Sequence, residues 1–119
     1  MAGGEKLFEN KIKAFLKKEG AWLVKYWAGN SFTKAGVPDI LACVNGIFMA
    51  IEVKAATGKP SELQLHTIEE IKKSGGVAFV LYPKDFEKFK QLVKTIKQTQ
   101  TKDFSELWDL RIIKEKEWK

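Results

Sequence analysis

The sequence predicts an α/β fold in one domain, with a mixed central sheet flanked by helices. Its length of 119 residues is typical of a single domain with one core. Segments with the apolar spacing of amphipathic helices alternate with short segments rich in β-branched and aromatic residues. Three strands follow each other over short connections, so we expect them to form an antiparallel meander. A helix can then carry the chain over to a fourth strand of the same sheet.

The N-terminal half predicts one helix and three strands. The helix has its apolar side chains on one stripe and ends at Gly20. Asn45-Gly46 separates the second and third strands, and this dipeptide between apolar runs is the strongest short signal for a hairpin. The helix is expected at residues 5–19 and the three strands at residues 22–27, 39–44 and 47–54. The loop before the hairpin is expected at residues 28–37.

The C-terminal half predicts a helix, a strand and a second helix. Ser61 is the expected N-cap of the first helix, and Gly75-Gly76 ends it. The strand is wholly apolar, as expected of one buried on both faces. These three elements are expected at residues 61–73, 77–82 and 84–98, with Phe86, Phe89, Val93 and Ile96 facing inward. The predicted core thus spans about 5–98 of a domain covering 1–119, and the tail 99–119 has no assigned structure.

The basic composition is compatible with a polyanionic partner, and equally with lysine-rich helices whose faces are solvated. There are 21 basic and 15 acidic residues, and Arg111 is the only arginine. Lysine suits contact with backbone phosphates, whereas base recognition more often uses arginine, so if nucleic acid binds we expect little sequence specificity. The single cysteine, Cys43, excludes an internal disulfide and is expected to be a small core residue. No segment is apolar enough for a membrane span or an export signal, so we expect a cytoplasmic protein.

The hairpin places acidic side chains opposite each other. With a two-residue turn, Asp39 pairs with Glu52, and their Cβ atoms should lie roughly 4.5–5.5 Å apart. Lys54 is two residues beyond Glu52 and therefore points to the same face. Two carboxylates at the end of a mostly apolar sheet repel each other, so a proton, Lys54 or a divalent cation must neutralise them.

Two interpretations of this group follow. In the first, Asp39, Lys54 and Glu52 form an ion triad that closes the end of the sheet. In the second, the carboxylates and the backbone carbonyl of Val53 hold Mg²⁺ or Mn²⁺, which prefer oxygen ligands. Lys54 would then stabilise the charge of a phosphoester transition state or orient the attacking water.

The order of motifs resembles that of the PD-(D/E)XK nuclease superfamily, and more narrowly that of stand-alone VRR-NUC domains, which are related to Holliday junction resolvases. The motifs are Glu9 on the first helix, Gly36-Val37-Pro38-Asp39, Glu52-Val53-Lys54, Gly58, and Ser61 with Gln64. The resemblance implies a single-domain restriction-endonuclease-like fold with an αβββαβ core. It covers about 9–82 and transfers nothing to the region from Lys84 onward.

The resemblance also implies roles for individual residues. Asp39 and Glu52 would bind the metal, Lys54 would be the catalytic lysine, and Glu9 and Gln64 would assist. The implied activity is Mg²⁺- or Mn²⁺-dependent hydrolysis of DNA, selective for branched or Holliday junction structures. A homodimer is implied, with no small-molecule cofactor and no membrane partner. Candidates for the dimer interface are Trp108, Ile112, Ile113 and Trp118, which could equally cover the core.

Several assignments keep two interpretations. Glu9 is either a site residue or a solvated helix glutamate. Gln64 either completes a capping box with Ser61 or points into the site. Lys34, with Asn30, Ser31 and Thr33, is either a phosphate contact or part of a solvated loop, and Ser61 is a further candidate DNA contact. His66, the only histidine, is interpreted as a surface or packing residue.

Two rival functions remain open. The chain could be a nucleic-acid-binding module in which the Asp-Glu-Lys group is purely structural. It could also be an endonuclease that cuts or nicks linear duplexes rather than junctions. The sequence does not separate these alternatives.

Overall fold

The computed structural model describes residues 2–27 and 33–100. Predictions for Asn30, Ser31, Arg111 and the tail beyond residue 100, including its candidate interface residues, lie outside this range. The elements follow the predicted order, with a short 3-10 turn added before the last helix. They are α1 (Ala2–Lys18), β1 (Trp22–Lys25), β2 (Ile40–Val44), β3 (Ile47–Val53), α2 (Glu62–Lys73), β4 (Val77–Leu81), η1 (Pro83–Asp85) and α3 (Phe86–Gln98).

The four strands form one mixed sheet in the order β1-β2-β3-β4, which confirms the predicted sheet. The first three strands are antiparallel and β4 is parallel to β3. Val44 pairs with Ile47, as predicted for a two-residue turn. Asn45 has φ 50° and Gly46 has φ 81°. These left-handed values match the twist of a hairpin and explain why this dipeptide fixes the register.

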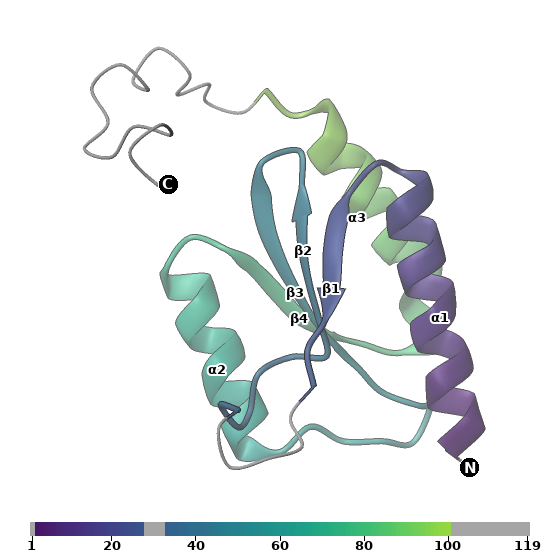
Figure 1. Ribbon diagram of the computed structural model, residues 1–119, viewed down its shortest axis with the longest axis vertical. Coiled ribbons are helices and arrows are strands. Elements are labelled where there is room, and N and C mark those ends of the chain that lie inside the picture. Colours follow the sequence, from purple (N-terminus) through teal and green to yellow (C-terminus); the bar gives the residue numbers. More distant parts are fainter. Residues whose placement is uncertain (1, 28–32, 101–119) are drawn as a thin grey trace, which may run out of the picture.

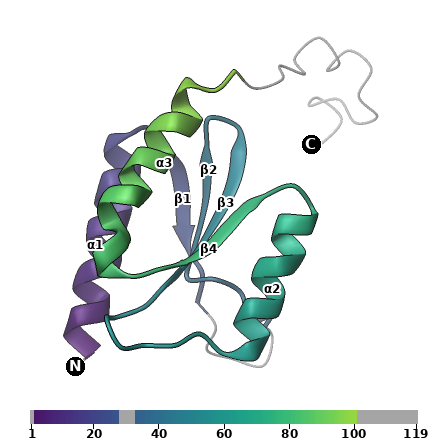
Figure 2. The same ribbon diagram turned by 180° about the vertical axis from the view of Figure 1, so that it is seen from behind.

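Helices cover both faces of the sheet. Helices α1 and α3 lie side by side on one face, and α2 lies on the other (Figures 1 and 2). The main core lies beneath α1 and α3 and includes Ile12, Leu16, Met49, Ile51 and Val93, each less than 1% exposed. A smaller cluster of Ala50, Ile68 and Ala78 lies beneath α2. Within the described residues, no helix is long and apolar enough to cross a membrane.

Two burial predictions are wrong, for a shared reason. Among the described residues, helix α2 packs mainly on β3 and β4, and the parts of β1 and β2 around Trp22 and Cys43 on that face stay exposed. Cys43 is therefore exposed rather than a core residue, and its neighbours Trp22 and Phe48 are 66% and 45% exposed. Strand β4 has cover on both faces but lies at the sheet edge, so Phe79 and Val80 are only partly buried.

Candidate active site

The predicted pair of carboxylates meets at one end of the β2–β3 hairpin. The last backbone pair of this ladder is Ile40 with Ile51, so the next position places Asp39 opposite Glu52. The predicted register is therefore confirmed. Gly36 lets the chain turn into this segment with φ 80°, where its α-carbon packs closely on Leu63 of α2.

Asp39 is held from three directions. Its Oδ2 accepts a hydrogen bond from the backbone N–H of Val53 at 2.8 Å, and its backbone carbonyl accepts one from Tyr26 at 2.8 Å. Its Oδ1 lies 3.4 Å from Nζ of Lys25. These contacts fix the carboxylate between β1 and β3 before any ligand binds, which is the preorganisation that a metal ligand needs.

Glu52 is almost completely buried, with 1% of its surface exposed. Its Oε2 accepts a hydrogen bond from Nε2 of Gln64 at 3.0 Å and lies 3.3 Å from Nζ of Lys54. Its Oε1 is buried and has no hydrogen-bond partner among the described residues. Burial and the nearby charge of Asp39 raise the pKa of Glu52, Lys54 opposes both effects, and the net pKa is about 7.

Gln64 forms the predicted capping box and also contacts Glu52, while its role in the reaction stays a prediction. Its Oε1 accepts a hydrogen bond from the backbone N–H of Ser61 at 2.8 Å, while Ser61 Oγ accepts one from the backbone N–H of Gln64 at 3.1 Å. This is the predicted capping box. Because the amide has two ends, its Nε2 remains free to donate to Glu52. The helix cap and the site are therefore joined through one side chain.

Glu9 is 5% exposed, so it is not an ordinary solvated helix glutamate. Its Oε1 lies 2.6 Å from Nζ of Lys25, and its Oε2 lies 3.2 Å from Nζ of Lys13. Burial would raise the pKa of Glu9, but hydrogen bonds and charge from Lys25 and Lys13 outweigh it, and the net pKa is lowered. Lys25 also contacts Asp39, so it links Glu9 to the carboxylate pair.

Lys25 is the site residue that the sequence interpretation missed. Burial would lower the pKa of its ammonium group, but the hydrogen bond to Glu9 and the charges of Asp39 and Glu9 raise it overall. A signal was present in the sequence. Lys25 lies two residues after Leu23, so it shares the face of β1 that packs on the main core. A lysine on such a face needs a carboxylate partner.

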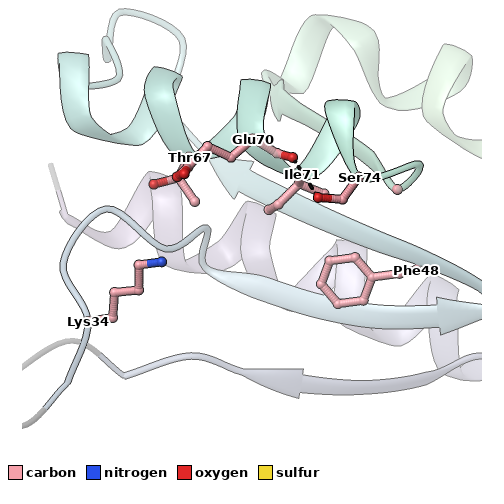
Figure 3. A pocket seen from close by; sticks show the side chains of 7 residues that line it. Lys34, Phe48, Thr67, Glu70, Ile71 and Ser74 are labelled. Atoms are coloured by element: carbon pink, nitrogen blue, oxygen red, sulfur yellow. Dashed lines mark hydrogen bonds between the residues drawn. The ribbon is translucent and has the colours of Figure 1, made fainter.

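Lys34 borders a hollow that the predicted carboxylates do not line. Its side chain borders a hollow on the α2 face, together with Thr67, Glu70, Ile71 and others (Figure 3). None of the predicted catalytic or metal-binding residues lines this hollow. His66 is on the surface, as interpreted from the sequence, and lies 3.6 Å from Glu70.

The residues present fit a hard divalent cation. Asp39 and Glu52 supply two carboxylates, and the unpartnered Oε1 of Glu52 is an acceptor without a donor in a buried position. In residues 2–27 and 33–100, no group of three acidic, histidine or cysteine side chains forms a metal site. The remaining ligands would have to be carbonyl oxygens and water. Mg²⁺ accepts that arrangement because it binds through one or two carboxylates and keeps several waters.

Comparison with known proteins identifies the family. The model of the archaeal Holliday junction resolvase (Hjc) family matches residues 3–109, which spans all of the helices and strands described above apart from the first residue of α1. No curated protein and no solved structure shows significant similarity to the chain. The mixed four-stranded sheet with flanking helices is consistent with the restriction-endonuclease-like fold of this family. The chain therefore belongs to the archaeal Holliday junction resolvase family, within the PD-(D/E)XK nuclease-like superfamily.

Proposed function

We propose that the protein hydrolyses phosphodiester bonds of branched DNA in a reaction that depends on Mg²⁺ or Mn²⁺. Membership of the Hjc family supports a structure-selective nuclease that acts on Holliday junctions. One observation carries the metal dependence: Glu52 is buried opposite Asp39, and one of its oxygens has no donor among the described residues. A carboxylate in this position is costly to ionise unless a cation completes its environment.

Each site residue then has a chemical role. Asp39, Glu52 and the backbone carbonyl of Val53 would hold the metal, which when bound supplies a Lewis acid and an activated water. Lys54, with Nζ 3.3 Å from Glu52, would place positive charge beside the phosphoryl oxygens as their charge develops, or orient the attacking water. Gln64 fixes the rotamer of Glu52 through its hydrogen bond, so it acts by positioning.

Glu9 supports the pair through Lys25 rather than by direct contact with Asp39. Lys25 places one ammonium group against a carboxylate from α1 and a carboxylate from the start of β2. The position of α1 is thereby coupled to that of Asp39. This arrangement supports the assisting role predicted for Glu9, with Lys25 as the physical link.

The remaining features complete the proposal. The net charge of +6 favours contact with DNA backbone phosphates, and such binding weakens as salt rises. A homodimer would present two sites to the two strands cut at a junction. The dimer, a cytoplasmic location, the candidate DNA contacts of Lys34 and Ser61, and the narrower likeness to VRR-NUC domains stay predictions within this proposal.

The test is a cleavage assay on four-way-junction, flap, duplex and single-stranded DNA with Mg²⁺, Mn²⁺ or EDTA. We expect the wild type to cut branched DNA only with metal, and Asp39→Asn, Glu52→Gln and Lys54→Met to lose at least about a hundredfold in rate. Glu87→Gln, which alters an exposed glutamate on α3, is the matched control and should cut normally.

Three outcomes would contradict parts of this proposal. Cleavage in EDTA would exclude the metal, and equal cutting of linear duplexes would favour the rival endonuclease. DNA binding without cleavage of any substrate would favour the binding module with a structural Asp-Glu-Lys triad.

A further inference from the structure

A second hollow lies next to the side chain of Lys54, against which Gly58 of its lining packs. It is formed by the loop 54–61 between β3 and α2 and by the segment that follows β4. Its volume is about 500 Å³, and its lining residues are Ala56, Thr57, Gly58, Lys59, Tyr82 and Lys84. The loop begins at Lys54, so the hollow and the proposed catalytic lysine share one short stretch of backbone.

The hollow carries positive charge without a compensating carboxylate. Lys59 and Lys84 both line it, and none of its lining residues is acidic. Neither lysine forms an ion pair with a carboxylate in the described part of the chain. The hollow beside Lys34 differs, because Glu70 lines it and opposes the lysine charge. Of these two hollows, the one beside Lys54 is therefore the better match for an anion.

The loop that forms this hollow is anchored at both sides. Tyr82 donates a hydrogen bond from its hydroxyl to the carbonyl of Gly58 at 2.9 Å, and the N–H of Gly58 donates to the carbonyl of Ala55 at 2.9 Å. The backbone N–H of Lys54 donates to the carbonyl of Leu81 at 3.1 Å, one residue before Tyr82. The hollow is thus fixed relative to the strand ends that position the site.

Close packing also joins the loop to the stem of Lys54. A Cβ atom added at Gly58 would lie 3.3 Å from Cδ of Lys54, so the glycine backbone rests against the lysine side chain. A strand of DNA with one phosphate at Lys54 would therefore continue along a surface that begins at Gly58. Regular spacing of phosphates along a strand makes a neighbouring basic hollow a natural second contact.

We propose that this hollow binds a further phosphate of the DNA backbone, through the ammonium groups of Lys59 and Lys84. The hydroxyl of Thr57, another lining residue, is an additional donor. The inference deepens the proposed nuclease function, since it assigns part of the DNA path beside the scissile phosphate. Contacts of this kind set the register of the strand and carry no base specificity.

The experiment measures DNA binding in EDTA, so that cleavage plays no part. Fluorescence anisotropy with a labelled four-way junction gives the dissociation constant over a range of salt. For Lys59→Ala/Lys84→Ala we expect roughly tenfold weaker binding at low salt, and a slope of log affinity against log salt that is smaller by up to about 1.8. The charge-matched control is Lys73→Ala/Lys94→Ala, which alters two exposed lysines on α2 and α3 and should bind like the wild type.

Further variants keep the result decisive. Lys59→Arg/Lys84→Arg preserves the charge and should retain binding, and the thermal midpoints should show that all three double variants fold. Equal loss in the two alanine double variants would overturn the inference, because it would reflect net charge alone. Unchanged binding by Lys59→Ala/Lys84→Ala would overturn it as well.

Failure of this inference is distinguishable from failure of the proposed function. If the wild type cleaves DNA and Lys59→Ala/Lys84→Ala binds normally, the proposed phosphate contact is wrong and the nuclease proposal stands. If the wild type binds through the two lysines but never cleaves with metal, the nuclease is wrong and the phosphate contact stands.

Discussion

Replacement of Glu52 by glutamine should make the metal-free protein more stable above pH 7. The residue is 1% exposed, and burial together with the charge of Asp39, opposed by Lys54, raises its pKa from 4.5 to about 7. Between these values the folded state holds a proton that the unfolded state has lost. The free energy of unfolding therefore falls as pH rises from about 4.5 to 7, and the full penalty is present above pH 7.

The magnitude follows from the size of the shift. At about 1.36 kcal/mol per pH unit, a pKa raised from 4.5 to about 7 corresponds to a penalty of about 3 kcal/mol. Glutamine has nearly the same shape and does not ionise. Its amide can still pair with Gln64, but it gives up the ion pair with Lys54, which Glu52 makes at 3.3 Å. We therefore expect Glu52→Gln to gain about 2 kcal/mol at pH 8.

The assay is urea unfolding of wild type and Glu52→Gln at several values between pH 4.5 and 8, in EDTA. The difference between the two proteins isolates Glu52, because all other titrating groups are common to both. Glu70→Gln, at an exposed position, should show no such pH-dependent difference. If Glu52→Gln is instead less stable than the wild type at pH 8, the ionised carboxylate stabilises the fold. The structural triad would then be the better explanation.

Two further substitutions test the supports of the site. Lys25→Met should lower the free energy of unfolding by about 2 kcal/mol, measured by urea unfolding. The reason is that Glu9 is 5% exposed and loses its shortest ion pair, at 2.6 Å. A loss below about 0.5 kcal/mol would contradict this reasoning. Gly36→Ala should cost about 2–3 kcal/mol, since Gly36 has φ 80° and a Cβ there would lie 2.6 Å from Cγ of Leu63. Gly20→Ala is its control, with φ 84° and nothing within 4 Å, and thermal unfolding should show a smaller loss there.

Local rules were sufficient to predict the central hairpin and the cap of α2. Asn45 and Gly46 adopt left-handed φ values that few other dipeptides tolerate, so the turn length and the pairing of Asp39 with Glu52 follow from two residues. The capping box likewise depends on residues three positions apart. Contacts of such short range are encoded in the sequence pattern itself, and both were predicted correctly.

Long-range packing determines the two features that the sequence pattern did not predict, the Lys25 contact and the exposure of Cys43. The contact of Lys25 with Glu9 depends on where α1 lies against β1, which no local pattern specifies. The exposure of Cys43 depends on how far α2 reaches across the sheet, and its strand pattern alone resembles that of a buried strand. The docking of helices on a sheet sets both features, and alternation along a strand cannot reveal which half of a face is covered.

The three carboxylates of the site differ in how far the protein's own cations satisfy them. Glu9 contacts three lysines, and Asp39 has both an N–H donor and Lys25. Glu52 has Lys54 and Gln64 on one oxygen only. Of the oxygens of these carboxylates, Glu52 Oε1 is therefore the one with neither a hydrogen bond nor an ion pair in the described part of the chain. A cation bound there would favour the ionised carboxylate. Mg²⁺ should accordingly stabilise the wild type most above pH 7, where the penalty on Glu52 is largest, and stabilise Glu52→Gln much less.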